Sequence, residues 1–188
     1  KQLRDLQISG IPKIHDLILE NDSLILIEDY IHGQTLEQLL EQLLAEQATL
    51  VYSDALAIMR KLCDVLKSLH TLTPPIIHRD LKLSNIILTS ENLVYIVDFD
   101  TARYYESGQE QDTELLGTKE YAPPEQYGFG QSDARSDIYA LGIIFNRLLT
   151  GEYPKHQLAD DRYRSVISKC IRWNPEERFQ TIEELEAA

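Results

Sequence analysis

The hydrophobic pattern near the start of the chain predicts a small hairpin. Two short apolar-rich runs, Lys13 to Glu20 and Leu24 to Tyr30, are separated by the polar residues Asn21-Asp22-Ser23. Asn, Asp and Ser favour tight turns because their side chains hydrogen-bond the neighbouring backbone, so we expect two paired strands. Before them, Lys1 to Leu6 is typical of the last turns of a helix, which Gly10-Ile11-Pro12 interrupts.

Helical periodicity follows this hairpin. Apolar residues recur every three to four positions from Leu36 to about Gln47, and again from Ser53 to about Leu72. Thr35 or Gln34 is the expected N-cap of the first helix, and Ser53 is that of the second. The inward positions, which we interpret as core, are Leu36, Leu39, Leu40, Leu43, Leu44, Ala55, Ile58, Met59, Leu62, Leu66 and Leu69.

The last third of the chain is predicted to be helical. A helix that is capped by Ser136 and ends near Thr150-Gly151 is apolar on all sides, which is typical of a buried helix. Another helix is expected from about Asp160 to Arg172, and the 153–159 segment leaves little room for one before it. A final helix begins at Thr181 with the spacing of a capping box.

A second hairpin is predicted in the middle of the chain, with polar residues on both sides of it. The run Ile86-Ile87-Leu88 and a β-branched, aromatic run enclose the turn formers Thr89-Ser90-Glu91-Asn92. Folding about this turn puts Asn85 roughly opposite Ile96. Because a strand rises about 3.3 Å per residue, Asp98 is then expected on the same rim as Asn85.

This rim carries side chains that suit phosphate chemistry. Asn85 and Asp98 offer the hard oxygen ligands that magnesium prefers, together with substrate phosphates. Asp80 is a carboxylate that can orient a hydroxyl group and accept its proton. Lys82 can stabilise negative charge in a transfer step. Each piece alone is commonly an ordinary turn or a solvated loop, whereas the combination in this order is specific.

The spacing of these residues resembles that of a known family. It is His-Arg-Asp-x-Lys-x-x-Asn over residues 78–85, with Asp98-Phe99 thirteen residues after the Asn. This pattern resembles the catalytic core of the protein kinases, and the lysine is similar to the serine/threonine branch. The resemblance implies an α+β fold, with a mostly helical C-terminal lobe and a remnant of the small β-rich N-terminal lobe.

The resemblance also implies a division of the chain. Residues 1–30 match part of the N-terminal lobe (the end of helix C and strands 4 and 5), residues 31–34 match the hinge, and residues 35–188 match the C-terminal lobe. Two departures fall near the expected nucleotide pocket. Glu28 occupies the gatekeeper position, where an apolar or small residue is usual, and Asp100 replaces the glycine that usually follows Asp-Phe.

ATP and Mg²⁺ are the implied cofactors, and a Ser or Thr hydroxyl of a protein is the implied acceptor. The implied catalytic set is Asp80, Lys82 and Asn85. In it Asp80 takes the proton of the acceptor hydroxyl and Lys82 stabilises the transferring group. Asn85 and Asp98 are the implied ligands of the magnesium ion that accompanies the nucleotide.

Contacts with the nucleotide itself are implied on the N-terminal side. The sequence Glu-Asp-Tyr-Ile-His-Gly over residues 28–33 resembles the hinge of the family, whose backbone groups recognise the adenine base. Asp29 and Ile31 fall at the expected contact positions. Ile87 matches a residue that lies under the adenine ring.

The polar segment from Thr101 to Leu116 resembles the activation segment of the family. Arg79 is the type of residue that pairs with a phosphate on this segment. We hypothesise that Thr113 or Thr118 is phosphorylated, and the alternative is an ordinary surface threonine. In the family the threonine matched by Thr118 also bonds the catalytic Asp and Lys.

Two structural contacts are implied beyond this segment. The Gly117–Glu125 block resembles Gly-Thr-x-x-Tyr-x-Ala-Pro-Glu, with Pro123 where the family usually has alanine. Glu125 matches a buried glutamate that pairs with a distant arginine, for which Arg178 is the expected partner. Asp137 matches the residue that hydrogen-bonds the catalytic-loop backbone.

Two motifs of the family do not occur in the 188 residues: Gly-x-Gly-x-x-Gly and a Val-Ala-Ile-Lys-like lysine. We therefore expect a fragment that begins inside the N-terminal lobe, rather than a short inert protein, because Asp80, Lys82, Asn85 and Asp98 are all retained. Nothing in such a fragment clamps the triphosphate, and positioning supplies most of the catalysis, so we expect it to be inactive alone.

Two other functions are weighed against this one. A pseudokinase or nucleotide-binding scaffold module stays open as the alternative. A small-molecule phosphotransferase of the same superfamily typically carries His-Gly-Asp and lacks the Gly-Thr-x-x-Tyr block, and both features argue against it here.

Composition and charge bear on the expected partners of the chain, on its cysteines and on its location. The net charge of −13 and the pI of about 4.7 make nucleic acid an unexpected partner, because an acidic surface repels phosphate backbones. Cys63 and Cys170 show no metal-like spacing and are expected to be buried free thiols. No apolar run reaches the length of about 18 residues that spans a membrane, so we expect a cytoplasmic chain, whose parent could still be membrane-anchored. The sequence Arg-Ser-Asp-Ile-Tyr-Ala-Leu-Gly over residues 135–142 resembles the corresponding sequence of bacterial kinases of the Gram-positive type.

Overall fold

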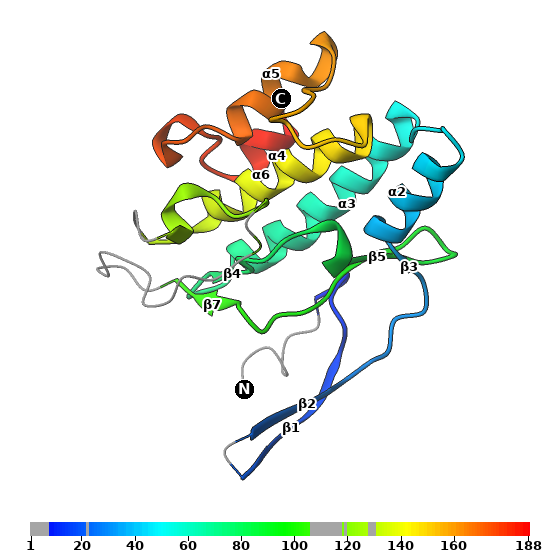
Figure 1. The fold of residues 1–188 in the computed structure, drawn as a ribbon. Coiled ribbons are helices and arrows are strands. Elements are labelled where there is room, and N and C mark those ends of the chain that lie inside the picture. Colours follow the sequence, from blue (N-terminus) through cyan, green and yellow to red (C-terminus); the bar gives the residue numbers. More distant parts are fainter. Residues whose placement is uncertain (1–7, 22, 106–117, 119, 128–130) are drawn as a thin grey trace.

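The computed structural model describes residues 8–21, 23–105, 118, 120–127 and 131–188. The strands of the described residues all precede residue 105, with helices α2 and α3 between them in sequence, and helices alone follow (Figure 1). The elements are β1 (Ile14–Glu20), β2 (Ser23–Glu28), β3 (Gln34–Thr35), α2 (Leu36–Ala45), α3 (Tyr52–His70), β4 (Ile76–Ile77), η1 (Leu83–Asn85), β5 (Ile86–Leu88), β6 (Val94–Ile96), β7 (Arg103–Tyr104), η2 (Pro124–Tyr127), α4 (Ala134–Thr150), α5 (Asp161–Cys170), η3 (Pro175–Glu177) and α6 (Ile182–Glu186).

The strands of the described residues form three small antiparallel sheets. Their orders are β1-β2, β3-β5-β6 and β4-β7. The β1-β2 hairpin lies apart from the helices, and an extended segment joins it to β3 and α2 (Figure 1). Both predicted hairpins are confirmed, and the combination of helices with small sheets is the expected α+β fold.

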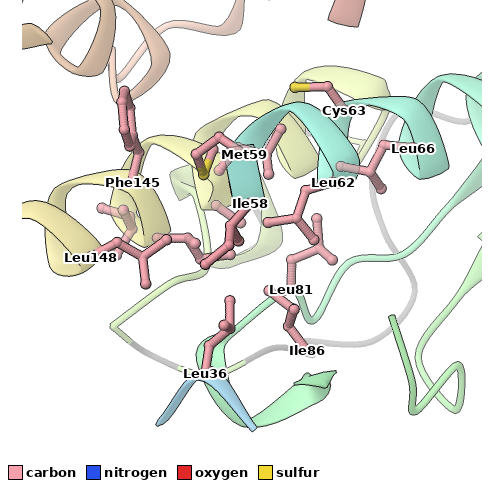
Figure 2. Close-up of a cluster of buried hydrophobic side chains, with 14 of the residues drawn as sticks. Leu36, Ile58, Met59, Leu62, Cys63, Leu66, Leu81, Ile86, Phe145 and Leu148 are labelled. Atoms are coloured by element: carbon pink, nitrogen blue, oxygen red, sulfur yellow. The ribbon is translucent and has the colours of Figure 1, made fainter. Parts of the chain in front are cut away.

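Helices α3 and α4 form the centre of the core. The leucine stripe predicted on α3 is buried, with Leu62, Leu66 and Leu69 each 0% exposed. Figure 2 shows side chains of α3 gathered with Phe145 and Leu148 of α4. Each such leucine stabilises the fold by roughly 1.5–3 kcal/mol relative to an exposed one. The apolar period therefore places the α3 core correctly, whereas the prediction that Leu44 is core is wrong: it lies in the last turn of α2 and is 47% exposed.

Two predicted helix starts are wrong. Helix α3 begins at Tyr52 with Val51 in the N-cap position, and Ser53 lies inside the first turn, where its hydroxyl donates to Asp54. Helix α4 begins at Ala134, because Asp133 accepts a hydrogen bond from the Arg135 N–H and caps it. In both cases a serine of good capping type lies within the first turn of a helix that begins earlier.

Other helix ends agree with the sequence. Thr35 caps α2 in a capping box with Gln38. Gly151 ends α4 in the left-handed conformation (φ 78°), which glycine adopts without strain. Thr181 caps α6 by accepting from the Glu184 N–H at 3.3 Å. The 151–160 segment contains no helix, as the limited room before α5 predicts.

The two cysteines are free and buried, as predicted. Burial raises the pKa of both Cys63 and Cys170 to about 12, so both thiols stay protonated at neutral pH.

The helix expected over residues 1–6 lies outside the described residues. Within the part of the chain that the structure describes, none of the helices combines the length and the apolar character that crossing a membrane needs.

A substitution at Gly142 tests how closely α4 and α5 pack. A Cβ atom there would lie 2.5 Å from Cys170 Cβ and 2.9 Å from Ile171 Cγ2. Alanine gains about 1 kcal/mol over glycine in an open helix, whereas overpacking costs about 1–3 kcal/mol. We expect Gly142→Ala to lower the free energy of unfolding by roughly 1 kcal/mol in a urea titration. Ser165→Ala on the exposed side of α5 is the control, and a stabilised Gly142→Ala protein would contradict the packing.

Candidate active site

Asp80 and Lys82 share one side of the loop between β4 and β5. Leu81 and Leu83 are 1% and 0% exposed, and Lys82 has extended backbone angles (φ −156°, ψ 163°). Side chains alternate along an extended chain. Burial of the two leucines therefore turns Asp80 and Lys82 toward the opposite side of the loop.

Four hydrogen bonds orient the carboxylate of Asp80. Lys82 Nζ lies 2.6 Å from Asp80 Oδ2, and Asn85 Nδ2 donates to the same oxygen at 3.3 Å. The backbone N–H and the hydroxyl of Thr118 donate to Asp80 Oδ1 at 3.0 Å and 2.9 Å. Lys82 Nζ also donates to the Thr118 hydroxyl at 3.2 Å. The structure thus brings Asp80, Lys82, Asn85 and Thr118 into one constellation.

The β5-β6 hairpin forms the predicted rim with a register that differs by one residue. Ile86 pairs with Ile96, and the Val97 N–H donates to the Asn85 carbonyl oxygen at 2.9 Å, so Asn85 lies opposite Val97. The expectation that Asn85 lies opposite Ile96 is wrong. Asn92 adopts a left-handed φ of 60°, and Leu93 belongs to the loop, which is one residue longer than the turn formers alone.

The donor atoms at this rim fit a magnesium ion that is shared with phosphate. Asn85 is buried, and its Nδ2 donates to the Asp80 carbonyl oxygen at 3.0 Å, which leaves Oδ1 as its ligand atom. Asp98 is exposed and offers a carboxylate. The described residues contain no group of three or more His, Cys, Asp and Glu side chains that could hold a metal by themselves. Magnesium keeps several waters and binds phosphates, so an amide and a carboxylate suffice.

Glu28 adds a carboxylate near this rim. Its pKa is raised, first by burial and then by the negative charges of Asp100 and Asp98. The two departures noted in the sequence, Glu28 and Asp100, are therefore electrostatically coupled to Asp98. The sequence placed both near the expected nucleotide pocket, and the fold, which brings β2 near the residues after β6, adds this coupling between their charges.

Asp137 of α4 anchors the backbone of the loop that leads to Asp80. It is 1% exposed and accepts from the His78 N–H and the Arg79 N–H, each at 3.0 Å. His70 Nε2 lies 2.8 Å from Asp137 Oδ2, the oxygen that also accepts from the His78 N–H. Burial alone would raise the pKa of Asp137, but the hydrogen bond and charge of His70 and the groups of His78 lower it below the ordinary value. These contacts hold Arg79 in its left-handed conformation (φ 71°).

His70 and Gln126 are parts of the site that the sequence reasoning missed. His70 ends α3 and supports Asp137, and Gln126 Nε2 donates to the Arg79 carbonyl oxygen at 2.6 Å. A polar residue at the end of an apolar stripe was the available signal for His70. Nothing local distinguishes Gln126 from a surface glutamine.

The ion pair predicted between Glu125 and Arg178 is present. Arg178 Nη1 and Nη2 donate to the two carboxylate oxygens of Glu125 at 2.7 Å and 2.9 Å, and the Arg178 side chain is 0% exposed. The Ser136 hydroxyl donates to Glu125 Oε1 at 2.8 Å. Ser136 therefore supports this pair instead of capping α4.

The expected nucleotide contacts lie around β2 and β5. Asp29 follows β2, where its N–H donates to the Lys13 carbonyl oxygen at 2.9 Å. Ile31 lies in the segment that leads to β3, and Ile87 of β5 pairs with Thr35. Their roles stay predictions. Thr113 lies outside the described residues, so its expected pairing with Arg79 also stays a prediction.

Fold and site together define a kinase-like domain. A helical body with small sheets holds an aspartate, a lysine and an asparagine on one loop, and a separate threonine contacts the aspartate. Residues 1–187 match the family described as protein kinase domain, and the chain belongs to this family.

The relatives are serine/threonine and receptor-like kinases. The serine/threonine-protein kinase PknB of Mycobacterium tuberculosis (strain ATCC 25177 / H37Ra) is 29% identical over 188 residues, which cover 86% of this chain and 29% of PknB. The probable serine/threonine-protein kinase CPE1738 of Clostridium perfringens (strain 13 / Type A) is 27% identical over 207 residues, 97% of this chain and 29% of the relative. Calmodulin-binding receptor-like cytoplasmic kinase 2 of Arabidopsis thaliana is 35% identical over 165 residues, 85% of this chain and 40% of the relative.

The chain thus spans less than a third of the length of the two bacterial relatives. The expected resemblance to bacterial, eukaryotic-like serine/threonine kinase domains is confirmed.

The protonation of His78 makes stability depend on pH. Nδ1 faces the Asp80 N–H and Nε2 faces the Val97 carbonyl oxygen, both at 3.3 Å, so the neutral ring satisfies both groups. Burial lowers the pKa of His78 below 6.5. The unfolded chain then binds more protons, so stability is complete above pH 6.5 and is lost as the pH falls toward the lower folded pKa.

We expect the free energy of unfolding of the wild-type protein to fall between pH 7 and pH 5, by up to about 1.4 kcal/mol per pH unit from this group. His78→Phe keeps a ring against Phe99 and should reduce that slope in urea titrations across the same range. The exposed His32→Gln is the control. Equal slopes for wild type and His78→Phe would remove His78 from this role.

Loss of one partner of the buried pair should be costly. Glu125→Gln leaves the Arg178 guanidinium uncompensated, and we expect a loss of about 3–5 kcal/mol in the free energy of unfolding. Glu176, which pairs with Arg135 and whose side chain is 73% exposed, provides the control. Glu176→Gln should cost less than about 1 kcal/mol, and equal effects of the two substitutions would contradict the argument from burial.

Proposed function

We propose that this domain belongs to an ATP-dependent protein kinase that transfers the γ-phosphate of ATP to Ser and Thr hydroxyls of proteins. The observation that carries the proposal is the carboxylate of Asp80, held between Lys82 and Thr118 and next to Asn85. The side chain of Asp80 is 10% exposed, so its carboxylate is largely shielded from solvent. A positioned base of this kind contributes about 10²–10⁴-fold to a proton transfer.

The roles follow from the chemistry of each group. Asp80 orients the acceptor hydroxyl and takes its proton, and Lys82 stabilises charge on the transferring group. Asn85 and Asp98 hold Mg²⁺, which supplies charge neutralisation for the phosphates when bound. Thr118, which hydrogen-bonds both side chains, fixes the positions of Asp80 and Lys82 relative to each other.

Nucleotide binding is assigned to the N-terminal side of this site. Asp29 and Ile31 contact the adenine base, and Ile87 lies beneath it. Residues 1–30 form part of an N-terminal lobe, residues 31–34 the hinge, and residues 35–188 the C-terminal lobe. The 188 residues alone contain no glycine-rich phosphate loop, so they transfer phosphate poorly without the rest of the kinase.

Regulation is assigned to the segment before Thr118. The Thr118 hydroxyl donates to Asp80 at 2.9 Å, and a phosphate there would remove this contact and add negative charge beside the carboxylate. This favours Thr113 over Thr118 as the regulatory phosphosite, with Arg79 as the partner of its phosphate.

The test uses the full-length protein that contains this domain. We expect the wild type to phosphorylate Ser or Thr residues of myelin basic protein with Mg²⁺ and ATP, and Asp80→Asn to lower kcat about 10²–10⁴-fold. The exposed Asp54→Asn is the matched control. Asp98→Asn should weaken binding of Mg²⁺–ATP in calorimetry, whereas Asp80→Asn should retain it. Binding of Mg²⁺–ATP without any transfer by the wild type would favour a nucleotide-binding scaffold instead.

A further inference from the structure

A buried arginine in α4 connects helix α2 with the turn that carries Thr118. Arg147 is 8% exposed, and its Nη1 donates to both carboxylate oxygens of Glu37 at 3.1 Å. The same Nη1 donates to the Tyr121 hydroxyl oxygen at 2.6 Å. These partners come from elements 110 and 26 residues away in the sequence. One guanidinium nitrogen therefore joins three separate parts of the chain.

The guanidinium depends on these partners because it is buried. The side chain of Glu37 is 31% exposed and supplies the negative charge, and the ring of Tyr153 lies 4.6 Å from the Arg147 Cζ atom. Arg147 Nε has no hydrogen-bond partner among the described residues. A buried cation is stable only when it is paired, so Arg147, Glu37 and Tyr121 form a set whose geometry is mutually constrained.

From Tyr121 the contacts continue to the catalytic aspartate. The ring of Tyr121 is 4% exposed and packs edge-to-face on Tyr153, with the ring centroids 5.7 Å apart. The N–H groups of Tyr121 and Ala122 both donate to the Thr118 carbonyl oxygen, at 2.8 Å and 2.9 Å. Thr118 in turn donates two hydrogen bonds to Asp80. Fixing the phenol of Tyr121 therefore fixes the turn that places Thr118.

On the side of Glu37, the set of Arg147, Glu37 and Tyr121 reaches the first turn of α2. Glu37 lies two residues after Thr35, which pairs with Ile87 in the β3-β5 sheet. The segment just before β3 is the one to which the proposed function assigns the nucleotide. The ion pair thus joins α2, which follows the segment proposed to bind the nucleotide, to the turn that carries Thr118.

We propose that Arg147 is a positioning residue that sets the acceptor-side turn of the active site, with Glu37 as its counter-ion, and this rests on the proposed kinase function. Arg147 acts through Tyr121 and Thr118 on the orientation of Asp80 and touches no reacting group itself. Its loss should impair use of the acceptor while binding of ATP is retained, because the nucleotide contacts lie on other elements. A purely structural arginine would lower stability without this selectivity.

The experiment compares three variants of the full-length protein. Arg147→Met removes the hydrogen bonds but keeps much of the apolar volume, and Arg147→Lys keeps a cation. Arg135→Met is the matched control, because Arg135 also lies in α4 and also forms ion pairs, with Asp133 and Glu176, and among the described residues its side chain is not bonded to the turn that carries Thr118. Arg147→Met should lower kcat/KM for myelin basic protein by about tenfold to a hundredfold with the Kd for Mg²⁺–ATP unchanged. Arg147→Lys should recover part of this loss, and Arg135→Met should leave kcat/KM within about twofold.

Amide hydrogen exchange gives a readout that needs no activity. The Thr118 N–H is protected by its bond to Asp80, so Arg147→Met should raise its exchange rate by about tenfold or more, whereas Arg135→Met should not. Unchanged Thr118 protection in Arg147→Met, or equal losses in both arginine variants, would overturn the proposal. If the wild type transfers no phosphate, the proposed function fails, and the exchange result still decides whether Arg147 positions the turn.

Discussion

The candidate site depends on a carboxylate that is buried in the middle of the molecule. Asp137 accepts hydrogen bonds from the consecutive N–H groups of His78 and Arg79 and is supported by His70. A buried charge is tolerated only when donors satisfy it, so these groups must remain together for the fold to be stable. The loop that leads to Asp80 is thereby fixed to α4, and the left-handed backbone of Arg79 is held by the same contacts.

Helix α4 supports the site at more than one place. Near its start, Asp137 holds the catalytic loop and Ser136 supports the Glu125–Arg178 pair. Near its end, Arg147 reaches Tyr121. Because the helix itself is buried among apolar residues, its polar side chains have fixed positions. The packing of α4 in the core thus determines where its polar side chains Ser136, Asp137 and Arg147 lie.

Much of the fold follows from local pattern, and the errors have identifiable causes. Periodicity predicts the helices, and their ends agree with the sequence at Gly151 of α4 and at Thr35, one of the two residues expected to cap α2. The residue type of Ser136 predicts a cap, but the helix begins earlier and the Asp133 side chain accepts from the Arg135 N–H instead. The β5-β6 register differed by one residue because Leu93 belongs to the loop.

By itself the sequence determined the order of the elements, the kinase resemblance and the positions of Asp80, Lys82, Asn85 and Asp98, because periodicity and motif spacing are local properties of the chain. Only the tertiary structure decided which other distant groups meet: His70 behind Asp137, Arg147 between Glu37 and Tyr121, and Glu28 near Asp98 and Asp100. Such contacts join residues that are far apart along the chain. They depend on how whole helices and strands pack, and no short window of sequence records that packing.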